Sequence, residues 1–434
     1  MAYQEVTHEG WFSRLGKSFG GIVTGIILIA AATFLLYWNE GRTVKTGGAI
    51  GEAQMNTVQM KDISKVAPFF DGKLVHATGR ADTKDMLRDP VFGVGKVAVK
   101  LDRNVEYYQW RESSRTEKRK KVGGGEETVT TYTYQKVWTG SPIDSNNFKD
   151  PDYIGINEVL AGFQDEQWVA PTVSFGAYML PGFLKNGIGG AQPLQVELTD
   201  QQKQEIAKTI SVSRRYLRMP GAVAPGALGE AADAAAQAIS GAVFDDNKRE
   251  IRREAYVHAQ SNVVYIGADP NSPHVGDVRV TFTETPPADV SIVAKIVGST
   301  FDQFTASNGY KFSRLDMGTV NPETMFQDAK TENTVMAWIL RVVGIILVMA
   351  GIRMVLAPLS VLADVIPILG TIVGAGTGIV AFLLGLAWSL LVIAIAWIRF
   401  RPLLAGGLIA AVVGLLALLY IKGRKNRKME GTIA

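Results

Sequence analysis

The sequence predicts a multipass α-helical membrane protein with a large extramembrane α+β domain inserted between the first and second transmembrane helices. Two observations predict this class: one long apolar run near the N-terminus, and a cluster of apolar runs in the last hundred residues. The segment between them mixes strand-like and helix-like patterns. A mean hydropathy of +0.11 is also typical of a chain with membrane segments.

The first predicted transmembrane helix covers residues 19–38. Its only polar side chains before the closing aromatic pair are Thr24 and Thr33. Twenty helical residues span about 30 Å, which is the thickness of the hydrocarbon core. Tyr37 and Trp38 stand where an interfacial aromatic belt is expected. A cleavable signal peptide has a shorter apolar core and a small-residue cleavage site, so we interpret this run as an uncleaved anchor.

Residues 335–421 predict a C-terminal bundle of about three transmembrane helices. The first covers about 335–357 and the last about 403–421. The apolar run at 365–398 holds no charged residue and is too long for one upright helix. It is either one tilted span, or a re-entrant piece around 366–368 followed by a span.

Charge predicts the sidedness of the chain. Residues 422–434 carry five basic residues and one acidic residue, which accounts for the net charge of +4 and marks a basic cytoplasmic tail. Four spans then place the N-terminal segment 1–18 in the cytoplasm as well, and the domain 39–334 outside it. Arg399 and Arg401 fall on the far side, against the rule.

The inserted domain begins with two strand-like runs, 98–110 and 128–138, which are rich in Val, Tyr, Thr and Trp. The charged run 111–121 and three glycines at 123–125 separate them. We expect a two-stranded arm with a charged, flexible tip. The tip could bind an anion, but a solvated loop is the simpler interpretation because no aromatic residues alternate with the charges.

The rest of the domain mixes helices and strands. Thr199 begins a capping-box pattern that predicts a helix to about residue 217, and an alanine-rich helix is expected over 228–243. Three further strand-like runs follow, at residues 255–266, 277–283 and 290–296.

No enzyme chemistry is visible in the sequence. The absence of cysteine excludes disulfides, thiolate metal sites and a cysteine nucleophile. The four histidines show no metal-ligand spacing, and no GxSxG elbow occurs. We therefore predict no enzyme, no catalytic, cofactor-binding or metal-binding residue, and no cofactor. Outside the tail, acidic and basic residues balance, so no nucleic-acid partner is expected.

Small residues recur every fourth position in two of the predicted spans. Such stripes allow helix backbones to approach closely, and they predict a tight bundle or the contact surface of a homo-oligomer. Chance is the alternative in a chain with 45 glycines. The residues are Gly370, Gly374, Gly378, Gly406, Ala410 and Gly414.

Two charged residues form a candidate intramembrane polar site. Arg341 lies about two turns inside its span, and Asp364 precedes Pro367. Charge within a membrane is costly and is by default a functional hypothesis. The alternatives are that Arg341 extends to the membrane surface and that Asp364 lies in a surface turn.

Several short motifs occur in one order along the chain. They are Asn39-Glu40-Gly41-Arg42-Thr43-Val44-Lys45-Thr46, Val66-Ala67-Pro68, Gly72-Lys73-Leu74-Val75-His76, Asp89-Pro90-Val91-Phe92-Gly93-Val94, Val105-Glu106-Tyr107-Tyr108-Gln109-Trp110, Ser145-Asn146-Asn147-Phe148, Val275-Gly276-Asp277-Val278-Arg279-Val280 and Phe400-Arg401-Pro402-Leu403. In this order the chain resembles the transmembrane protein 43 family, also called LUMA, over about residues 10–421.

The resemblance implies a multipass protein with its large domain outside the cytosol. Animal members lie in the endoplasmic reticulum and inner nuclear membrane, self-associate, and organise partners such as lamins and emerin. No enzymatic activity is implied. The absence of cysteine and the Ala/Gly-rich spans fit a bacterial member, for which the site is the inner membrane with the domain in the periplasm.

We therefore predict a non-enzymatic integral membrane scaffold, or envelope-organising protein. It would self-associate through its membrane helices, contact membrane lipids, and present the outer domain to protein partners that the sequence does not identify. The alternative is a channel or transporter subunit with a polar path near Arg341 and Asp364.

Overall fold

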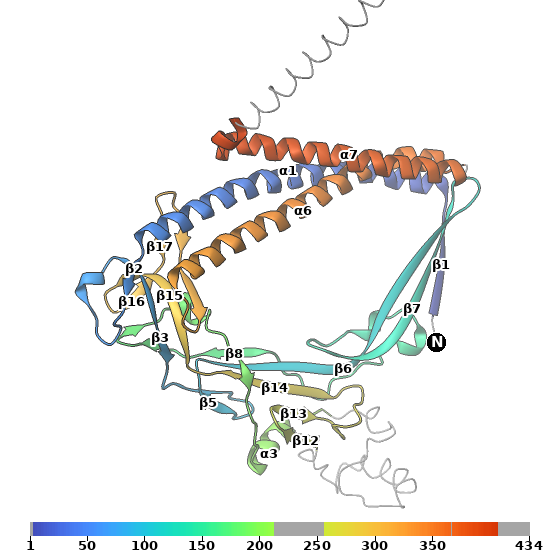
Figure 1. The fold of residues 1–434 in the computed structure, drawn as a ribbon. Helices are drawn as coiled ribbons and strands as arrows, with labels where there is room; N and C mark the ends of the chain where they lie inside the picture. Colours follow the sequence, from blue (N-terminus) through green and yellow to red (C-terminus); the bar gives the residue numbers. More distant parts are fainter. Residues whose placement is uncertain (1–2, 212–255, 366, 407–434) are drawn as a thin grey trace, which may run out of the picture.

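The computed structural model describes residues 3–211, 256–365 and 367–406. A layer of three long helices forms one side of a ring, and a β-rich domain with a long arm forms the rest (Figure 1). The helices are α1 (Trp11–Asn56), α6 (Pro322–Ala363) and α7 (Pro367–Phe400). Each contains an apolar stretch long enough to cross a membrane.

The helices extend beyond the predicted spans. The run 19–38 lies in the middle of the 46-residue α1, so residues 39–56 are helical and do not belong to the β-rich domain. Likewise α6 begins at Pro322, where the Asn321 side chain accepts a hydrogen bond from the Thr324 amide. These extensions carry more polar residues than the spans, which explains why hydropathy alone ended the helices early.

Residues 367–398 of the second apolar run lie in one helix, α7. At 34 residues, α7 is about 51 Å long. In the described part of this run, residues 365 and 367–398, the structure shows this one helix and no separate piece before it. The predicted span 403–421 and the tail 422–434 lie largely or wholly outside the described residues.

Glycines let the three helices pack closely. A Cβ atom on Gly351 would lie 2.8 Å from the Gly25 carbonyl oxygen, and one on Gly344 would lie 2.6 Å from Leu36 Cδ2. Likewise, a Cβ on Gly385 of α7 would lie 2.6 Å from Met349 Cγ of α6. The contacts between these helices therefore require glycine at specific positions.

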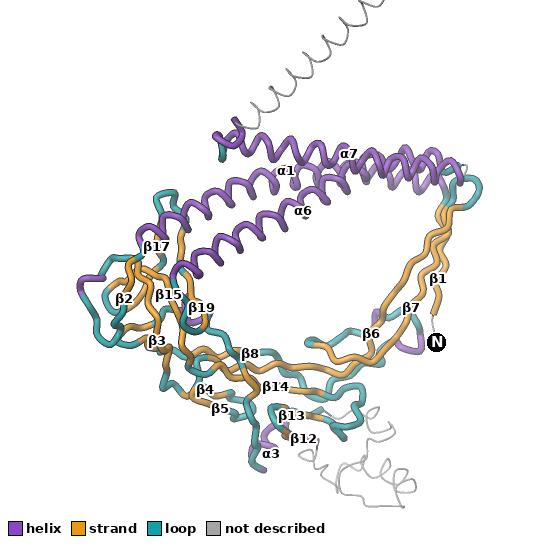
Figure 2. The backbone as a smooth tube through the Cα atoms, viewed as in Figure 1, coloured by secondary structure: helices purple, strands orange, loops and turns teal. Residues whose placement is uncertain are grey.

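Two sheets build the β-rich domain (Figure 2). In the larger sheet the strands lie in the order β1 (Tyr3–Glu9), β7 (Glu126–Thr139), β6 (Lys100–Lys120), β14 (Val278–Thr285), β13 (Val263–Ile266) and β12 (Val257–Gln260). Two short strands pair at its side, β8 (Glu166–Val169) with β6 and β11 (Gln192–Pro193) with β14. In the second sheet the order is β19 (Arg314–Met317), β15 (Ala288–Val297), β16 (Thr300–Asp302), β10 (Tyr178–Met179), β9 (Ser174–Phe175), β3 (Leu74–Asp82) and β2 (Val58–Met60).

The remaining elements are short. Two further hairpins pair β4 (Met86–Arg88) with β5 (Gly95–Val97) and β17 (Phe304–Thr305) with β18 (Lys311–Phe312). The short helices are α2 (Gly182–Lys185) and α3 (Asp200–Lys208), with 3-10 turns at 68–70, 145–147 and 151–153.

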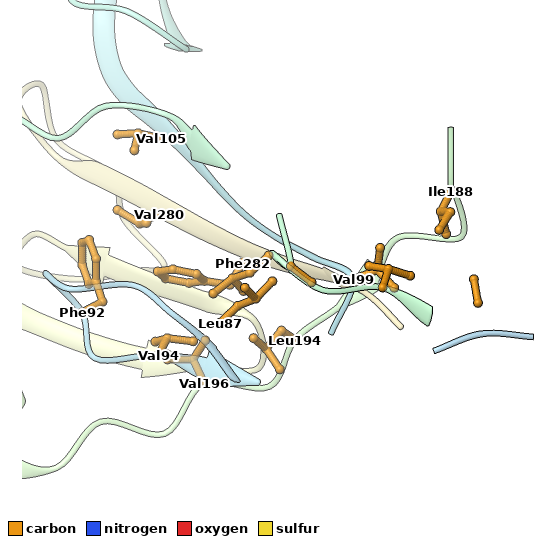
Figure 3. Close-up of a cluster of buried hydrophobic side chains, with 14 of the residues drawn as sticks. Leu87, Phe92, Val94, Val99, Val105, Ile188, Leu194, Val196, Val280 and Phe282 are labelled. Carbon is orange, nitrogen blue, oxygen red and sulfur yellow. The ribbon is translucent and has the colours of Figure 1, made fainter. Parts of the chain in front are cut away.

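The core lies between the sheets and the loops that cover them. In β14, Val278, Val280 and Phe282 alternate with partly exposed residues, as expected for a strand with one buried face. Phe282 packs against Phe92, with ring centroids 5.5 Å apart (Figure 3). A smaller cluster joins the domain to α1 and α6: Ile50, Ala53, Leu74, Val293, Met325, Phe326 and Ala329.

The strand and helix predictions meet mixed outcomes. The strand-like runs all contain strands, with 255–266 divided into β12 and β13. The Thr199 capping box is confirmed, but α3 ends at Lys208, before the predicted residue 217. The alanine-rich run 228–243 lies outside the described residues.

The prediction of a flexible tip at residues 111–125 of the arm is wrong for most of these residues. Residues 111–120 continue β6 and pair with β7 up to Lys120 and Glu126. Opposite charges on the two strands explain this: Lys118 Nζ lies 2.9 Å from Glu126 Oε1. Only residues 121–125 form the turn.

Candidate functional site

A buried ion pair connects α1 and α6 near the domain. Arg341 Nε and Nη2 donate to the two carboxylate oxygens of Glu40, at 2.6 and 2.9 Å. The Glu40 side chain is fully buried and that of Arg341 is 10% exposed. Trp397 of α7 donates from Nε1 to Glu40 Oε2 at 2.9 Å, so one carboxylate joins all three helices.

The rest of the Asn39-Glu40-Gly41-Arg42 motif packs at the same level. Asn39 Nδ2 donates to the Ala337 carbonyl at 3.0 Å. A Cβ on Gly41 would lie 2.8 Å from Phe400 Cζ, so this position requires glycine for the contact of α1 with α7. Arg42 has buried Nε and Nη2 atoms without a hydrogen-bond partner in the described part of the chain.

Arg341 is held by a protein carboxylate, and its extension to the membrane surface stays one of the two interpretations of its sequence position. It lies between helices and pairs with a carboxylate two residues past the predicted first span. The sequence contains a signal for this pairing, because a glutamate directly after one apolar run and an arginine inside another are both costly unless paired. The spacing alone does not show that the two helices align.

Asp364 binds two cations at the opposite end of the helical layer. Its carboxylate accepts from Arg14 Nη2 at 2.6 Å and from Lys120 Nζ at 2.5 Å, and its side chain is 2% exposed. Arg14 comes from the start of α1 and Lys120 from the arm. Asp364 therefore lies in a turn, as one interpretation predicted, but the turn is buried by the arm.

Backbone contacts strengthen this junction. Gly123 of the arm donates its amide to the Val365 carbonyl at 3.1 Å, and Trp11 Nε1 donates to the Val361 carbonyl at 2.8 Å. The Gly124 carbonyl accepts from Arg14 Nη1 at 2.5 Å. The arm tip, the start of α1 and the end of α6 thus form one contact, which we name the far-end junction (Figure 1).

Residues 3–9 form β1, which pairs along its whole length with residues 126–132 of β7, in the β-rich domain. The N-terminal strand and the domain are therefore in contact through a three-stranded arm. The count of basic residues does not reveal this contact, because pairing between distant strands leaves no trace in the charge pattern. The side of the membrane on which the segment 1–18 and the domain 39–334 lie stays a prediction.

Arg341 and Asp364 do not form one site. They lie 23 positions apart in sequence, about 35 Å along α6, and each is neutralised by its own partners. The polar path proposed from sequence would need both in one channel. The structure instead assigns them to two separate junctions, one at each end of the helical layer.

The predicted glycine stripes do not make the described helix contacts. A Cβ on Gly378 or on Gly406 would meet nothing within 4 Å, and one on Gly374 would only reach Ser360 Cβ at 4.0 Å. Gly370 lies in the first turn of α7, and Ala410 and Gly414 lie outside the described residues. Among the described residues, none packs closely on the stripe at 374 and 378.

Known proteins are similar to this chain over most of its length. Residues 107–402 match the family described as Transmembrane protein 43. The human protein of that name is 26% identical over 439 residues, which cover 97% of this chain and 94% of the human protein. The rat protein is also 26% identical, over 95% of this chain and 91% of the rat protein. A Drosophila melanogaster homolog is 24% identical over 89% of this chain and 90% of the homolog. No solved structure matches the chain. The chain therefore belongs to the transmembrane protein 43 family.

Proposed function

We propose that this chain is a non-enzymatic scaffold of the membrane in which its helices lie. The helices self-associate, and the β-rich domain presents its surface to protein partners on one side. In a bacterium this would be the inner membrane, with the domain and the N-terminal strand together in the periplasm. The helical layer then enters the bilayer from that side, because both ends of α1 contact the same domain.

The observation that supports self-association is a face of α7 that the described residues leave open. The helix presents large exposed apolar side chains, including Phe382 and Leu383, and its small-residue stripe at Gly374 and Gly378 has no close contact with any residue that the structure describes. Other glycines make the contacts inside the layer. A free stripe on an apolar helix favours close packing with a second copy.

Leucine at both stripe positions is expected to weaken the oligomer. In Gly374→Leu/Gly378→Leu, two bulky side chains would separate the facing backbones, and the dissociation constant of the detergent-solubilised oligomer should rise at least ten-fold, or about 1.4 kcal/mol. Analytical ultracentrifugation over a range of protein-to-detergent ratios measures this change.

Gly376→Leu provides the matched control. Gly376 lies between the two stripe residues on a different face of α7, and a Cβ there also meets nothing within 4 Å. The control should assemble like the unsubstituted chain. Equal oligomer size in all three proteins would contradict self-association through this stripe.

A further inference from the structure

The end of the helical layer where α7 ends carries arginines that no carboxylate among the described residues neutralises. The one acidic residue of the motif, Glu40, already pairs with Arg341. Arg42, Arg399 and Arg401 form no ion pair with any residue in the described ranges, and the last two only face aromatic rings, of Phe400 at 5.8 Å and Trp397 at 5.9 Å.

These arginines lie at one level of the layer, although they come from two helices. Gly41 contacts the Phe400 ring, and Tyr37 packs on the same ring with centroids 5.4 Å apart. Arg42 follows Gly41 on α1, while Arg399 and Arg401 flank Phe400 at the end of α7. Their positions thus converge from the two sides of one helix contact.

Arg42 is the most unusual of the three. Its Nε and Nη2 atoms are buried and donate to no acceptor among the described residues. Buried donors of a charged group are costly to leave unpaired, commonly by more than a neutral hydrogen bond is worth. The Nη1 atom of Arg42 is not buried in this way, so the guanidinium keeps one donor that a phosphate group can reach.

The surroundings match the headgroup region of a bilayer. Trp38 and Trp338 lie near the Glu40–Arg341 pair in sequence and are 44% and 59% exposed, as expected for aromatic residues at a membrane interface. The apolar parts of the helices lie on one side of this level, and on the other side α1 and α6 continue as more polar helices to the β-rich domain (Figure 2). The phosphates of membrane lipids are the anions found at this depth.

We propose that Arg42, with Arg399 and Arg401, binds the phosphate of an acidic phospholipid headgroup at this end of the layer. The site selects lipids with a net negative charge, because three arginines at this level have no ion-pair partner among the residues that the structure describes. It does not depend on self-association, and it gives this chain a preference for acidic membrane regions.

Thermal unfolding of the purified full-length chain in dodecyl maltoside tests the site. Dioleoyl phosphatidylglycerol should raise the Tm more than dioleoyl phosphatidylcholine at the same concentration. Arg42→Gln/Arg401→Gln should weaken phosphatidylglycerol binding by about five-fold for each arginine removed. Arg353→Gln is the matched control: Arg353 is exposed in the middle of α6, and its loss should leave the lipid preference unchanged.

Three outcomes would overturn the proposal. One is an unchanged preference for phosphatidylglycerol in Arg42→Gln/Arg401→Gln. Another is an equal loss in Arg353→Gln, which would indicate general charge attraction. The third is equal stabilisation by sodium phosphate at matched ionic strength, which would assign the site to free phosphate. If the double variant does not fold, Arg401→Gln alone, at the end of α7, should still lower the preference.

Discussion

Replacing Arg341 by leucine is expected to lower the free energy of unfolding by about 3–5 kcal/mol, because the substitution leaves the Glu40 carboxylate buried without its partner. Glu40 is fully buried, so water cannot replace the lost donors. The remaining donor is Trp397 Nε1, which cannot neutralise the charge. Unfolding in mixed micelles at increasing denaturant measures the change.

Two comparisons separate the ion pair from general packing. Glu40→Leu/Arg341→Leu should be less destabilised than the sum of the single variants, since it leaves no buried charge. Arg353→Leu, on the exposed face of the same helix, should be close to neutral. Additive effects of the two single substitutions would show that Glu40 and Arg341 do not act as a pair.

Leucine at Gly351 is expected to separate α1 from α6. Its Cβ would lie 2.7 Å from Ile29 Cγ1 and 2.8 Å from the Gly25 carbonyl oxygen, and a backbone atom cannot move aside. Overpacking of this kind costs about 1–3 kcal/mol or more, and here the helices must shift along their contact. Limited proteolysis should then cleave the segments that connect the helices faster in Gly351→Leu than in the unsubstituted chain.

Gly20→Leu is the comparison for this prediction. Gly20 also lies in α1, but a Cβ there meets nothing within 4 Å, so added bulk should be tolerated. Equal protease resistance of Gly351→Leu and Gly20→Leu would contradict the close contact of α1 with α6.

Local patterns predicted the elements of this fold better than their extents. Apolar runs located α1, α6 and α7, and residue composition located β6, β7 and β12–β15 but missed strands such as β1 and β3. Hydropathy could not show that α1 continues to Asn56, because its last turns pack on the domain through only a few residues such as Ile50 and Ala53. The charged run 111–120 resembled a loop because cross-strand pairing is not visible in one strand.

The candidate sites show the same limit. Arg341 and the Asn39-Glu40-Gly41-Arg42 motif stood out in the sequence, but their convergence depends on helix packing. The partners of Asp364 come from residues 14 and 120, which no local pattern relates to it. The predicted glycine stripes followed a valid packing rule, yet the described contacts use Gly25, Gly344, Gly351 and Gly385.

The central claim is that the β-rich domain closes on both ends of the helical layer. The chain has no cysteine, so Val6→Cys/Val129→Cys introduces a single pair, at positions directly opposite each other in β1 and β7. Oxidation of intact membranes with copper phenanthroline should give an intramolecular disulfide. Val6→Cys/Thr139→Cys, with its second cysteine at the other end of β7, should give none. Failure of Val6→Cys/Val129→Cys to cross-link, with an impermeant maleimide labelling positions 6 and 129 from opposite sides, would contradict the closed fold and place β1 and β7 on opposite sides of the membrane.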